Sequence, residues 1–284
     1  MLRIGDSHGH VNPVKGIGPR KLAKRFVESG GWLYGLVNLL SWSLGVEVRG
    51  ADDYRRLYDA TVRAAEEMRR EGLVVPVILG PHPAETAKLI ARGVPPRKAV
   101  EVSVEAYRIA AKYVEKGLAH GLGEVGRPHW PAPREQVEAC DEVTRHVIRL
   151  AAELDVPVHL HTERREEALA LASKLARELG LRKVVAHHIG GELGRVALQL
   201  GMIPSVPAKA NELASSAGIL RHAVVESDFL DDPRRPGAVV APWSIGRTIR
   251  RLLERGVIDE EDALRALVLN PARLYSVAAP FKSP

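Results

Sequence analysis

The sequence predicts a closed (β/α)8 barrel, or TIM barrel, with extra helices at its C-terminal end. Three observations lead to this prediction. The length of 284 residues is close to the roughly 250 residues typical of such barrels. Short apolar runs alternate eight times with segments of helical periodicity, as expected for parallel strands joined by helices. No linker, low-complexity tract or short repeat interrupts the chain, so residues 1–284 are expected to form one domain.

The predicted elements follow from apolar runs, helix periodicity and the placement of Pro and Gly. The strands are expected at 2–6, 32–40, 74–79, 118–125, 156–161, 183–187, 202–206 and 223–228. The helices are expected at 19–27, 52–70, in segments up to about 116, and at 134–154, 164–179, 191–200, 245–255, 260–267 and 271–275.

Several of these elements carry specific signals. The first helix has Pro19 in its first turn and ends at Gly30 and Gly31, a favoured arrangement. The segment 32–40 is almost continuously apolar, which is typical of a parallel strand covered on both faces. Pro76 is unfavourable within the third strand because it cannot donate a backbone hydrogen bond. The three helices after the eighth strand are expected to cap and close the barrel.

The composition is that of an ordinary globular protein, with 45% hydrophobic and 27% charged residues. No apolar run is long enough for a membrane span, and Asp6 comes too early for a secretory leader, so a cytoplasmic location is expected. The single cysteine, Cys140, cannot form an internal disulfide and lies in a charged helical stretch. We interpret it as a bystander.

The formal net charge of +6 comes mainly from arginine. Excess arginine can attract phosphates or build ion-pair networks on the surface. Most of the Arg pairs fall within amphipathic helices beside Asp or Glu, which favours the second explanation.

The motif Asp6-Ser7-His8-Gly9-His10 indicates a metal site at the end of the first strand. Residues two apart in an extended chain project to the same face, so Asp6, His8 and His10 can share one side of the sheet.

Other potential ligands also follow strands, whose C-terminal ends meet at the mouth of a barrel. They are His8, His10, His82, Glu124, His161, His187 or His188, and Asp228. Imidazoles and carboxylates suit zinc, manganese, nickel or iron, and the lack of cysteine favours a catalytic over a closed structural site.

The remaining histidines are weighed by position. His159 is expected to fill the barrel beneath His161. Adjacent residues are not expected to point inward together, so His187 is favoured over His188. His82, which precedes a proline, is interpreted as a substrate-binding or supporting residue. The histidines interpreted as structural are His120, His129, His146 and His222.

The stretch from Gly121 to Gly126 matches the dinucleotide motif G-x-G-x-x-G, but Arg127 and Pro128 follow where a phosphate-binding helix should begin. The dinucleotide interpretation therefore fails. We expect these glycines instead to let Glu124 approach metal and substrate closely.

Several motifs together resemble the TatD-type metal-dependent hydrolases of the amidohydrolase superfamily, over nearly the whole chain. They are DSHGH (6–10), GEVG (123–126), LHTE (160–163), AHHIGG (186–191), ESD (226–228) and NPARL (270–274). The resemblance implies two divalent ions: one on His8, His10 and Asp228, a second on His161 and His187, and Glu124 bridging them.

Zinc is the favoured ion, with manganese, nickel, iron or magnesium as alternatives. The family is associated with hydrolysis of phosphodiesters, notably as deoxyribonucleases. The chain departs from the family pattern with Arg127-Pro128 in place of the usual Leu-Asp and His188 in place of the usual Cys. The segments 41–46 and 80–85 indicate an archaeal-like branch. These departures leave the substrate open.

The leading hypothesis is thus a metal-dependent hydrolase that cleaves a phosphoester, in DNA or a nucleotide. Asp228 would take the proton of the attacking water, and Arg127, Arg164 and Lys209 would bind phosphate oxygens. One alternative is hydrolysis of an amide, lactone or ester, because the same metal centre polarises a carbonyl group. Another is a noncatalytic nucleic-acid-binding protein, although only 5% of residues are aromatic and no basic–aromatic stripe occurs. The sequence leaves the physiological substrate and the oligomeric state open.

Overall fold

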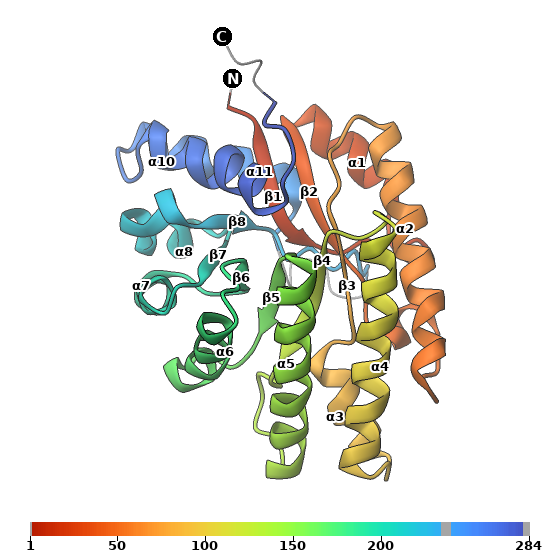
Figure 1. The fold of residues 1–284 in the computed structure, drawn as a ribbon. Coiled ribbons are helices and arrows are strands. Elements are labelled where there is room, and N and C mark those ends of the chain that lie inside the picture. The colour runs from red at the N-terminus through yellow and green to blue at the C-terminus, as the bar shows by residue number, and fades with distance from the viewer. Residues whose placement is uncertain (1, 234–239, 281–284) are drawn as a thin grey trace.

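The computed structural model describes residues 2–233 and 240–280 and shows a nearly closed barrel of eight parallel strands in sequence order, surrounded by helices (Figure 1). The predicted (β/α)8 fold is confirmed, whereas the single domain over 1–284 stays a prediction. The strands are β1 (Ile4–Gly9), β2 (Gly31–Val37), β3 (Val77–Leu79), β4 (Gly121–Gly126), β5 (Val158–His161), β6 (Val184–Ala186), β7 (Ile203–Pro207) and β8 (Val224–Glu226).

The barrel is closed between β1 and the segment that follows β8. The backbone N–H of Asp228 donates to the carbonyl oxygen of His8 at 2.9 Å, and the N–H of His10 donates to that of Phe229 at 2.7 Å. This closure brings the carboxylate of Asp228 beside the two histidines of β1, although 218 or more residues separate them in the chain.

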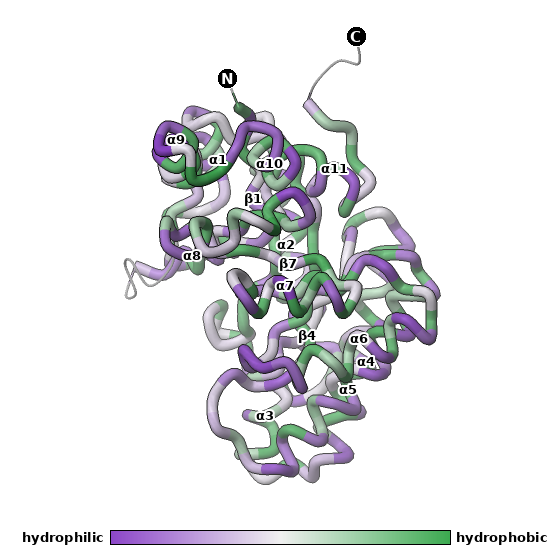
Figure 2. The backbone as a smooth tube through the Cα atoms, turned by 90° about the vertical axis from the view of Figure 1, so that its left-hand side faces the viewer, coloured by the Kyte–Doolittle hydropathy of each residue, from purple (hydrophilic) through white to green (hydrophobic). Residues whose placement is uncertain are grey.

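The helices lie outside the strands and present apolar sides to them. In α4, Val100, Val104 and Tyr107 are buried, while Arg97 and Glu101 lie in solvent. Figure 2 shows hydrophilic and hydrophobic segments alternating along the outer helices. The α-helices are α1 (Pro19–Glu28), α2 (Tyr54–Arg70), α3 (Pro83–Ala91), α4 (Pro96–Glu115), α5 (Arg134–Leu154), α6 (Glu166–Glu178), α7 (Gly191–Gln199), α8 (Ala210–Ser215), α9 (Ile245–Glu254), α10 (Glu260–Leu264) and α11 (Asn270–Leu274).

Some boundaries differ from the predicted ones for clear reasons. β3 is limited to Val77–Leu79, because Pro76 has no N–H for the ladder; upstream of it, Val74 forms only an isolated bridge with Leu33. β1 extends to Gly9 and so includes His8. The sequence patterns missed α8 and the 3₁₀ helix η3 (Ala217–His222), which connect β7 to β8. The predicted helix at 260–267 is α10 followed by a π-helical turn, η5 (Arg265–Leu269).

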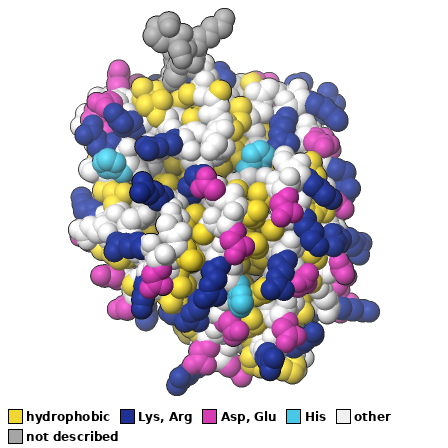
Figure 3. Space-filling view, viewed as in Figure 1, with side chains coloured by type: hydrophobic (Ala, Val, Ile, Leu, Met, Phe, Trp, Pro, Cys, Tyr) yellow, Lys and Arg dark blue, Asp and Glu magenta, His cyan; other side chains and the backbone are white. Residues whose placement is uncertain are grey.

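The surface in Figure 3 carries Lys and Arg interspersed with Asp and Glu, without a patch of one sign. Ion pairs within helices, such as Arg134–Glu138, support the explanation that the arginines build surface networks. Cys140 is buried, and burial raises the pKa of its thiol to about 12, which fits a bystander. No helix in the described parts of the chain combines the length and apolarity needed to cross a membrane.

Candidate metal centre

The residues that the sequence placed at strand ends come together at the C-terminal mouth of the barrel. Among the residues that the structure describes, four sets of three have ligand atoms within 4.8 Å of one another. They are His8/Glu124/His187, His8/His10/Asp228, His161/His187/His188 and His82/Glu124/His161.

Glu124 lies between the two groups of histidines. Its Oε1 is 3.7 Å from Nε2 of His8 and 3.3 Å from Nε2 of His187, and its Oε2 is 3.7 Å from Nε2 of His10. Burial alone would raise the pKa of this carboxyl, but the surrounding histidines, His8 first, hold it well below its usual range. An ionised carboxylate whose two oxygens face different ligands is suited to bridge two cations.

Three of the histidines present the same nitrogen to the centre. The Nδ1 atom of His8 contacts His159 at 2.9 Å, that of His10 contacts the carbonyl oxygen of Val37 at 3.1 Å, and that of His187 contacts Glu226 at 2.7 Å. Metal-ligating histidines are typically held through their other ring nitrogen in this way. The Nε2 atom of each is therefore the one available to a metal.

Two further observations show that these histidine and carboxylate side chains fit a divalent cation. The Nε2 atoms of His8 and His187 are buried and have no hydrogen-bond partner within 2–233 and 240–280, which is costly for a polar atom unless something binds it. A tetrahedral ion with bonds of about 2.0–2.1 Å holds its ligand atoms about 3.3 Å apart. The separations around Glu124, and the 3.5 Å between His10 Nε2 and Asp228 Oδ1, are close to that value.

Asp6 does not join the centre as its spacing had suggested. Its Oδ1 accepts hydrogen bonds from the backbone N–H of Ser227 at 2.9 Å and of His8 at 3.3 Å, so it ties β1 to the chain after β8. Burial raises the pKa of this carboxyl to about 7. The expectation that its face would hold a cation applies to His8 and His10 only.

The glycines of β4 let two strands lie close together, while their expected role in bringing Glu124 close to metal and substrate stays a prediction. Gly123 has a φ of 150° and Gly126 a φ of 137°, in the region that favours glycine. A Cβ on Gly123 would lie 2.8 Å from the Cβ of His159, and one on Gly126 would collide with the carbonyl of His161. These glycines therefore let β4 approach β5, which brings Glu124 and His161 within 2.9 Å of each other.

Glu226 is a supporting residue that the sequence reasoning did not single out. It is fully buried, its Oε2 accepts from Nδ1 of His187 and from the hydroxyl of Ser205, and its Oε1 accepts from the N–H of His188 at 3.0 Å. It orients His187 from beneath. The available signal was its place in the ESD motif, two residues before Asp228.

The expectation that only one of the adjacent histidines faces inward is wrong. His188 has a φ of 60°, and this left-handed turn brings its ring 3.4 Å from that of His187, with its Nδ1 3.7 Å from Oδ2 of Asp228. His187 is fully buried and closest to Glu124, whereas His188 borders the mouth. His187 as the ligand stays a prediction that this geometry favours.

His82 lies beside the centre, with its ring centroid 4.4 Å from that of His161. Its Nδ1 accepts a hydrogen bond from the N–H of Ala84 at 2.9 Å and caps α3. A neutral ring then carries its hydrogen on Nε2, so His82 presents a donor rather than a metal ligand. This agrees with its interpretation as a substrate-binding or supporting residue.

His129 was interpreted as structural, and this interpretation is wrong. Its Nδ1 lies 2.6 Å from Nε2 of His161, and it lines the mouth cavity. His161 is therefore held between His129 on one nitrogen and Glu124 on the other, and would bind metal through Nδ1. The position of His129 in the sequence gave no signal, because the turn after β4, and not the periodicity of a strand, brings His129 to the centre.

Arg127 fixes that turn, and its expected role in substrate binding stays a prediction that this geometry does not favour. Its guanidinium forms a two-pronged ion pair with Asp141 at 2.5 and 2.7 Å and is not among the residues of the mouth cavity. The pair anchors the segment that carries His129 to α5.

The mouth cavity has a volume of about 450 Å³. The side chains that border it are mainly polar: His129, Thr162, Arg164, His188, Lys209, Glu212, Ser227 and Asp228. Arg164 contacts Glu212 at 3.3 Å and is half-exposed. Lys209 forms no ion pair with any residue of the described ranges, so its charge is free to meet an anion there.

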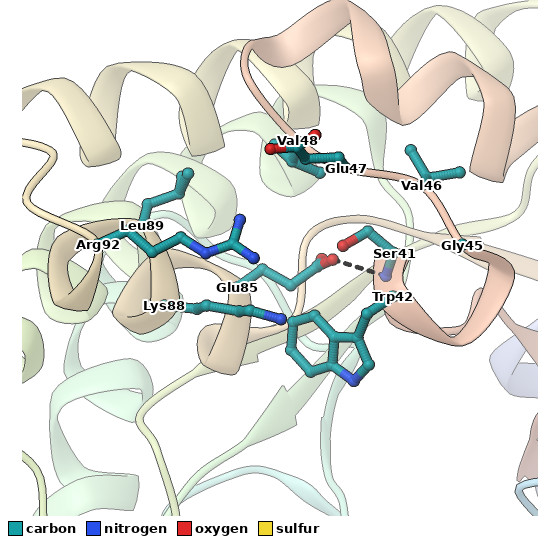
Figure 4. Close-up of a pocket in the computed structure, with 10 residues that line it drawn as sticks. All are labelled: Ser41, Trp42, Gly45, Val46, Glu47, Val48, Glu85, Lys88, Leu89 and Arg92. Atoms are coloured by element: carbon teal, nitrogen blue, oxygen red, sulfur yellow. Dashed lines mark hydrogen bonds between the residues drawn. The ribbon is translucent and has the colours of Figure 1, made fainter.

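A second pocket, of about 220 Å³, lies outside the barrel mouth (Figure 4). Lys88 sits over the ring of Trp42, and the buried carboxylate of Glu85 accepts from the N–H of Ser41 at 2.8 Å. None of the candidate ligands lines this pocket. We therefore assign the functional site to the mouth.

Comparisons with known proteins agree with this site. The family model described as TatD related DNase matches residues 5–276. An uncharacterized protein of Methanocaldococcus jannaschii, MJ1127, is 31% identical over 97% of this chain and 96% of its own length. The human deoxyribonuclease TATDN3 is 25% identical over 73% of this chain and 76% of its own.

Among solved structures, the TatD homolog YJJV of Escherichia coli superposes with a TM-score of 0.66 at 21% identity, covering 98% of this chain and 99% of that one. This likeness shows the shared fold. The family match and the buried His, Glu and Asp cluster together support a metal-dependent hydrolase. Since the family model covers nearly all of the chain, the chain belongs to the family of TatD related DNases.

Proposed function

We propose that this protein is a divalent-metal-dependent hydrolase of phosphodiesters in DNA or nucleotides. The observation that carries the proposal is a cluster beside the mouth cavity. In it, the buried Nε2 atoms of His8 and His187 lie close to the carboxylates of Glu124 and Asp228. The cavity itself is lined by Arg164 and Lys209, among others. The match to a family of DNases and the human relative named a deoxyribonuclease support the choice of substrate.

The cations are assigned to the residues named above. His8, His10 and Asp228 would hold one, and His161 and His187 a second, with Glu124 shared between them and zinc as the favoured ion. Divalent cations at such a site lower the pKa of a bound water and offset charge on the attacking and leaving oxygens.

Asp228 is suited to receive the proton of the attacking water. Its Oδ1 faces His10 at 3.5 Å and His187 at 3.9 Å, while its Oδ2 faces the ring of His188 at 3.7 Å. The side chain is 20% exposed, so the second oxygen reaches the mouth. Asp228 borders the mouth cavity, whereas Glu124 is not among its lining residues.

Positive charge and hydrogen-bond donors would hold the substrate. Lys209 and Arg164 border the cavity and would bind phosphoryl oxygens. If His161 ligates through Nδ1, its Nε2–H donates to Nδ1 of His129, and His129 then offers its own Nε2–H to the cavity. A phosphoryl or leaving oxygen is the expected acceptor.

A substrate panel on chelated and reconstituted protein tests the proposal. We expect turnover of bis(4-nitrophenyl) phosphate and of an end-labelled single-stranded oligonucleotide only after Zn²⁺ or Mn²⁺ is returned. Lys209→Met should raise KM for the phosphodiester about tenfold through loss of a charge-assisted contact, whereas Lys88→Met, outside the mouth, should not. Turnover of a lactone or aryl ester alone would favour the carbonyl alternative, and DNA binding without metal-dependent turnover would favour a noncatalytic role.

A further inference from the structure

Three buried side chains form a line of hydrogen bonds beneath the metal centre. Tyr275, which directly follows α11, has its hydroxyl 2.7 Å from the carbonyl oxygen of Ser7 and 3.0 Å from Nε2 of His159. Nδ1 of His159 lies 2.9 Å from Nδ1 of His8. His8 and His159 are fully buried, and Tyr275 is 5% exposed.

The positions of the hydrogens follow from what each atom can do. The Ser7 carbonyl oxygen only accepts, so the hydroxyl hydrogen of Tyr275 points to it. The hydroxyl oxygen then accepts from Nε2–H of His159. Both ring nitrogens of His159 are thus engaged with neutral partners in a dry environment, which favours a neutral ring.

A neutral His159 with its hydrogen on Nε2 has a bare Nδ1. The single hydrogen between the two Nδ1 atoms therefore belongs to His8, and Nε2 of His8 is bare. That atom faces Glu124 at 3.7 Å and has no hydrogen-bond partner in the described structure.

We propose that Tyr275 and His159 are positioning residues that fix His8 in the tautomer whose Nε2 can bind metal. The proposal rests on the metal centre assigned above. The proposal gives the C-terminal helices a role in metal binding beyond closing the barrel. They position the Tyr275 hydroxyl, which determines which ring nitrogen of His159, and then of His8, carries the hydrogen.

The surroundings are built to keep this line in place. A side chain at Gly35 of β2 would collide with the Ser7 carbonyl and lie 3.0 Å from the Tyr275 hydroxyl, so only glycine leaves room for their contact. Asn270, at the start of α11, donates to the carbonyl oxygens of Ala223 at 2.7 Å and Arg221 at 3.1 Å. These contacts anchor the helix from which Tyr275 emerges.

The experiment measures Zn²⁺ affinity of the full chain by competition with a chromophoric chelator, and the His8 tautomer in metal-free protein by ¹⁵N NMR of the imidazoles. Without its hydroxyl partner, His159 is free to move its hydrogen to Nδ1 and force the opposite tautomer on His8. We expect Tyr275→Phe to weaken Zn²⁺ binding about tenfold, and His159→Leu about 10- to 100-fold, the usual cost of losing a partner of a ligand.

Two matched variants separate tautomer control from general damage. Tyr58→Phe also removes a buried hydroxyl that donates to a backbone carbonyl, that of Ala106 at 3.2 Å, but it should leave affinity and tautomer unchanged. His159→Asn keeps an acceptor near the Nδ1 position and should recover most of the affinity lost in His159→Leu.

Wild-type affinity in both Tyr275→Phe and His159→Leu, or a His8 that carries its hydrogen on Nε2 in the metal-free wild type, would overturn the proposal. Failure of the wild type to bind Zn²⁺ at all would instead overturn the metal centre itself. If Tyr275→Phe does not fold, the His159→Leu and His159→Asn pair decides, because equal affinities in the two would contradict an acceptor role.

Discussion

Replacing Glu226 by Gln should weaken metal binding by His187, although Glu226 itself is not a proposed ligand. The carboxylate accepts three hydrogen bonds, from His187 Nδ1 at 2.7 Å, from the N–H of His188 at 3.0 Å and from the hydroxyl of Ser205. An amide has one acceptor oxygen, and the backbone N–H of His188 can only donate, so the oxygen should remain there. The NH₂ group then faces His187 Nδ1, which must become an acceptor and move its hydrogen to Nε2.

The expected cost follows from this forced tautomer. Loss of an orienting partner typically lowers metal affinity about 10- to 100-fold, or about 1.4–2.7 kcal/mol. One buried hydrogen bond to a charged acceptor is also lost, so the free energy of unfolding without metal should fall by about 2 kcal/mol. Chelator competition with Zn²⁺ and urea denaturation of the metal-free protein measure the two quantities separately.

Glu85→Gln is the matched control for this variant. Glu85 is also buried and accepts from two backbone N–H groups, those of Ser41 at 2.8 Å and His82 at 3.2 Å, but it touches no ligand ring. It should lose stability and keep its Zn²⁺ affinity. Wild-type Zn²⁺ affinity in Glu226→Gln would refute the reasoning that Glu226 sets the His187 tautomer.

The other predictions concern the centre and its surroundings. Glu124→Gln should lower occupancy of both ions and turnover together, with an unchanged circular dichroism spectrum; two retained ions with normal rates would exclude a bridging role. Asp228→Asn should retain at least one ion by elemental analysis yet lose turnover, because an amide cannot take the water's proton, and near-normal rates would contradict this. Burial lowers the pKa of His188, but Glu226 and Asp228 outweigh it and raise that pKa to about 9. Since the folded protein binds this proton more tightly, metal-free protein should lose up to about 3 kcal/mol of stability between pH 6.5 and 9. Urea denaturation of His188→Gln should show a smaller pH slope, and an unchanged slope would contradict the assignment to His188. Arg127→Gln and Asp141→Asn each remove the ion pair that anchors the turn carrying His129, so both should lower the melting temperature and change KM by a similar factor. A larger rise in KM in Arg127→Gln alone would indicate a phosphate-binding role.

The fold and most of the centre follow from local patterns. Apolar runs mark the strands, and the barrel rule converts strand ends into one mouth, so His8, Glu124, His161 and Asp228 could be placed together without coordinates. Pro76 signalled the weakness of β3, which is only three residues long.

What the patterns could not predict depends on backbone geometry outside regular elements. A left-handed residue turns His188 toward the mouth, and the turn fixed by Arg127 and Asp141 delivers His129. Neither His188 nor His129 lies in a helix or strand whose periodicity would predict the direction of its side chain. Hydrogen-bond partners far apart in sequence, such as His159 and Tyr275, are brought together only once the C-terminal helices are packed against β1 and β8.

The most direct test of the account is an anomalous difference map, recorded at a metal absorption edge from crystals of the purified protein supplied with Zn²⁺. We expect two peaks at the barrel mouth, one beside Nε2 of His8 and His10 and one beside Nδ1 of His161 and Nε2 of His187, with Glu124 between them. A mouth without anomalous density, in crystals where Zn²⁺ is bound elsewhere, would contradict it.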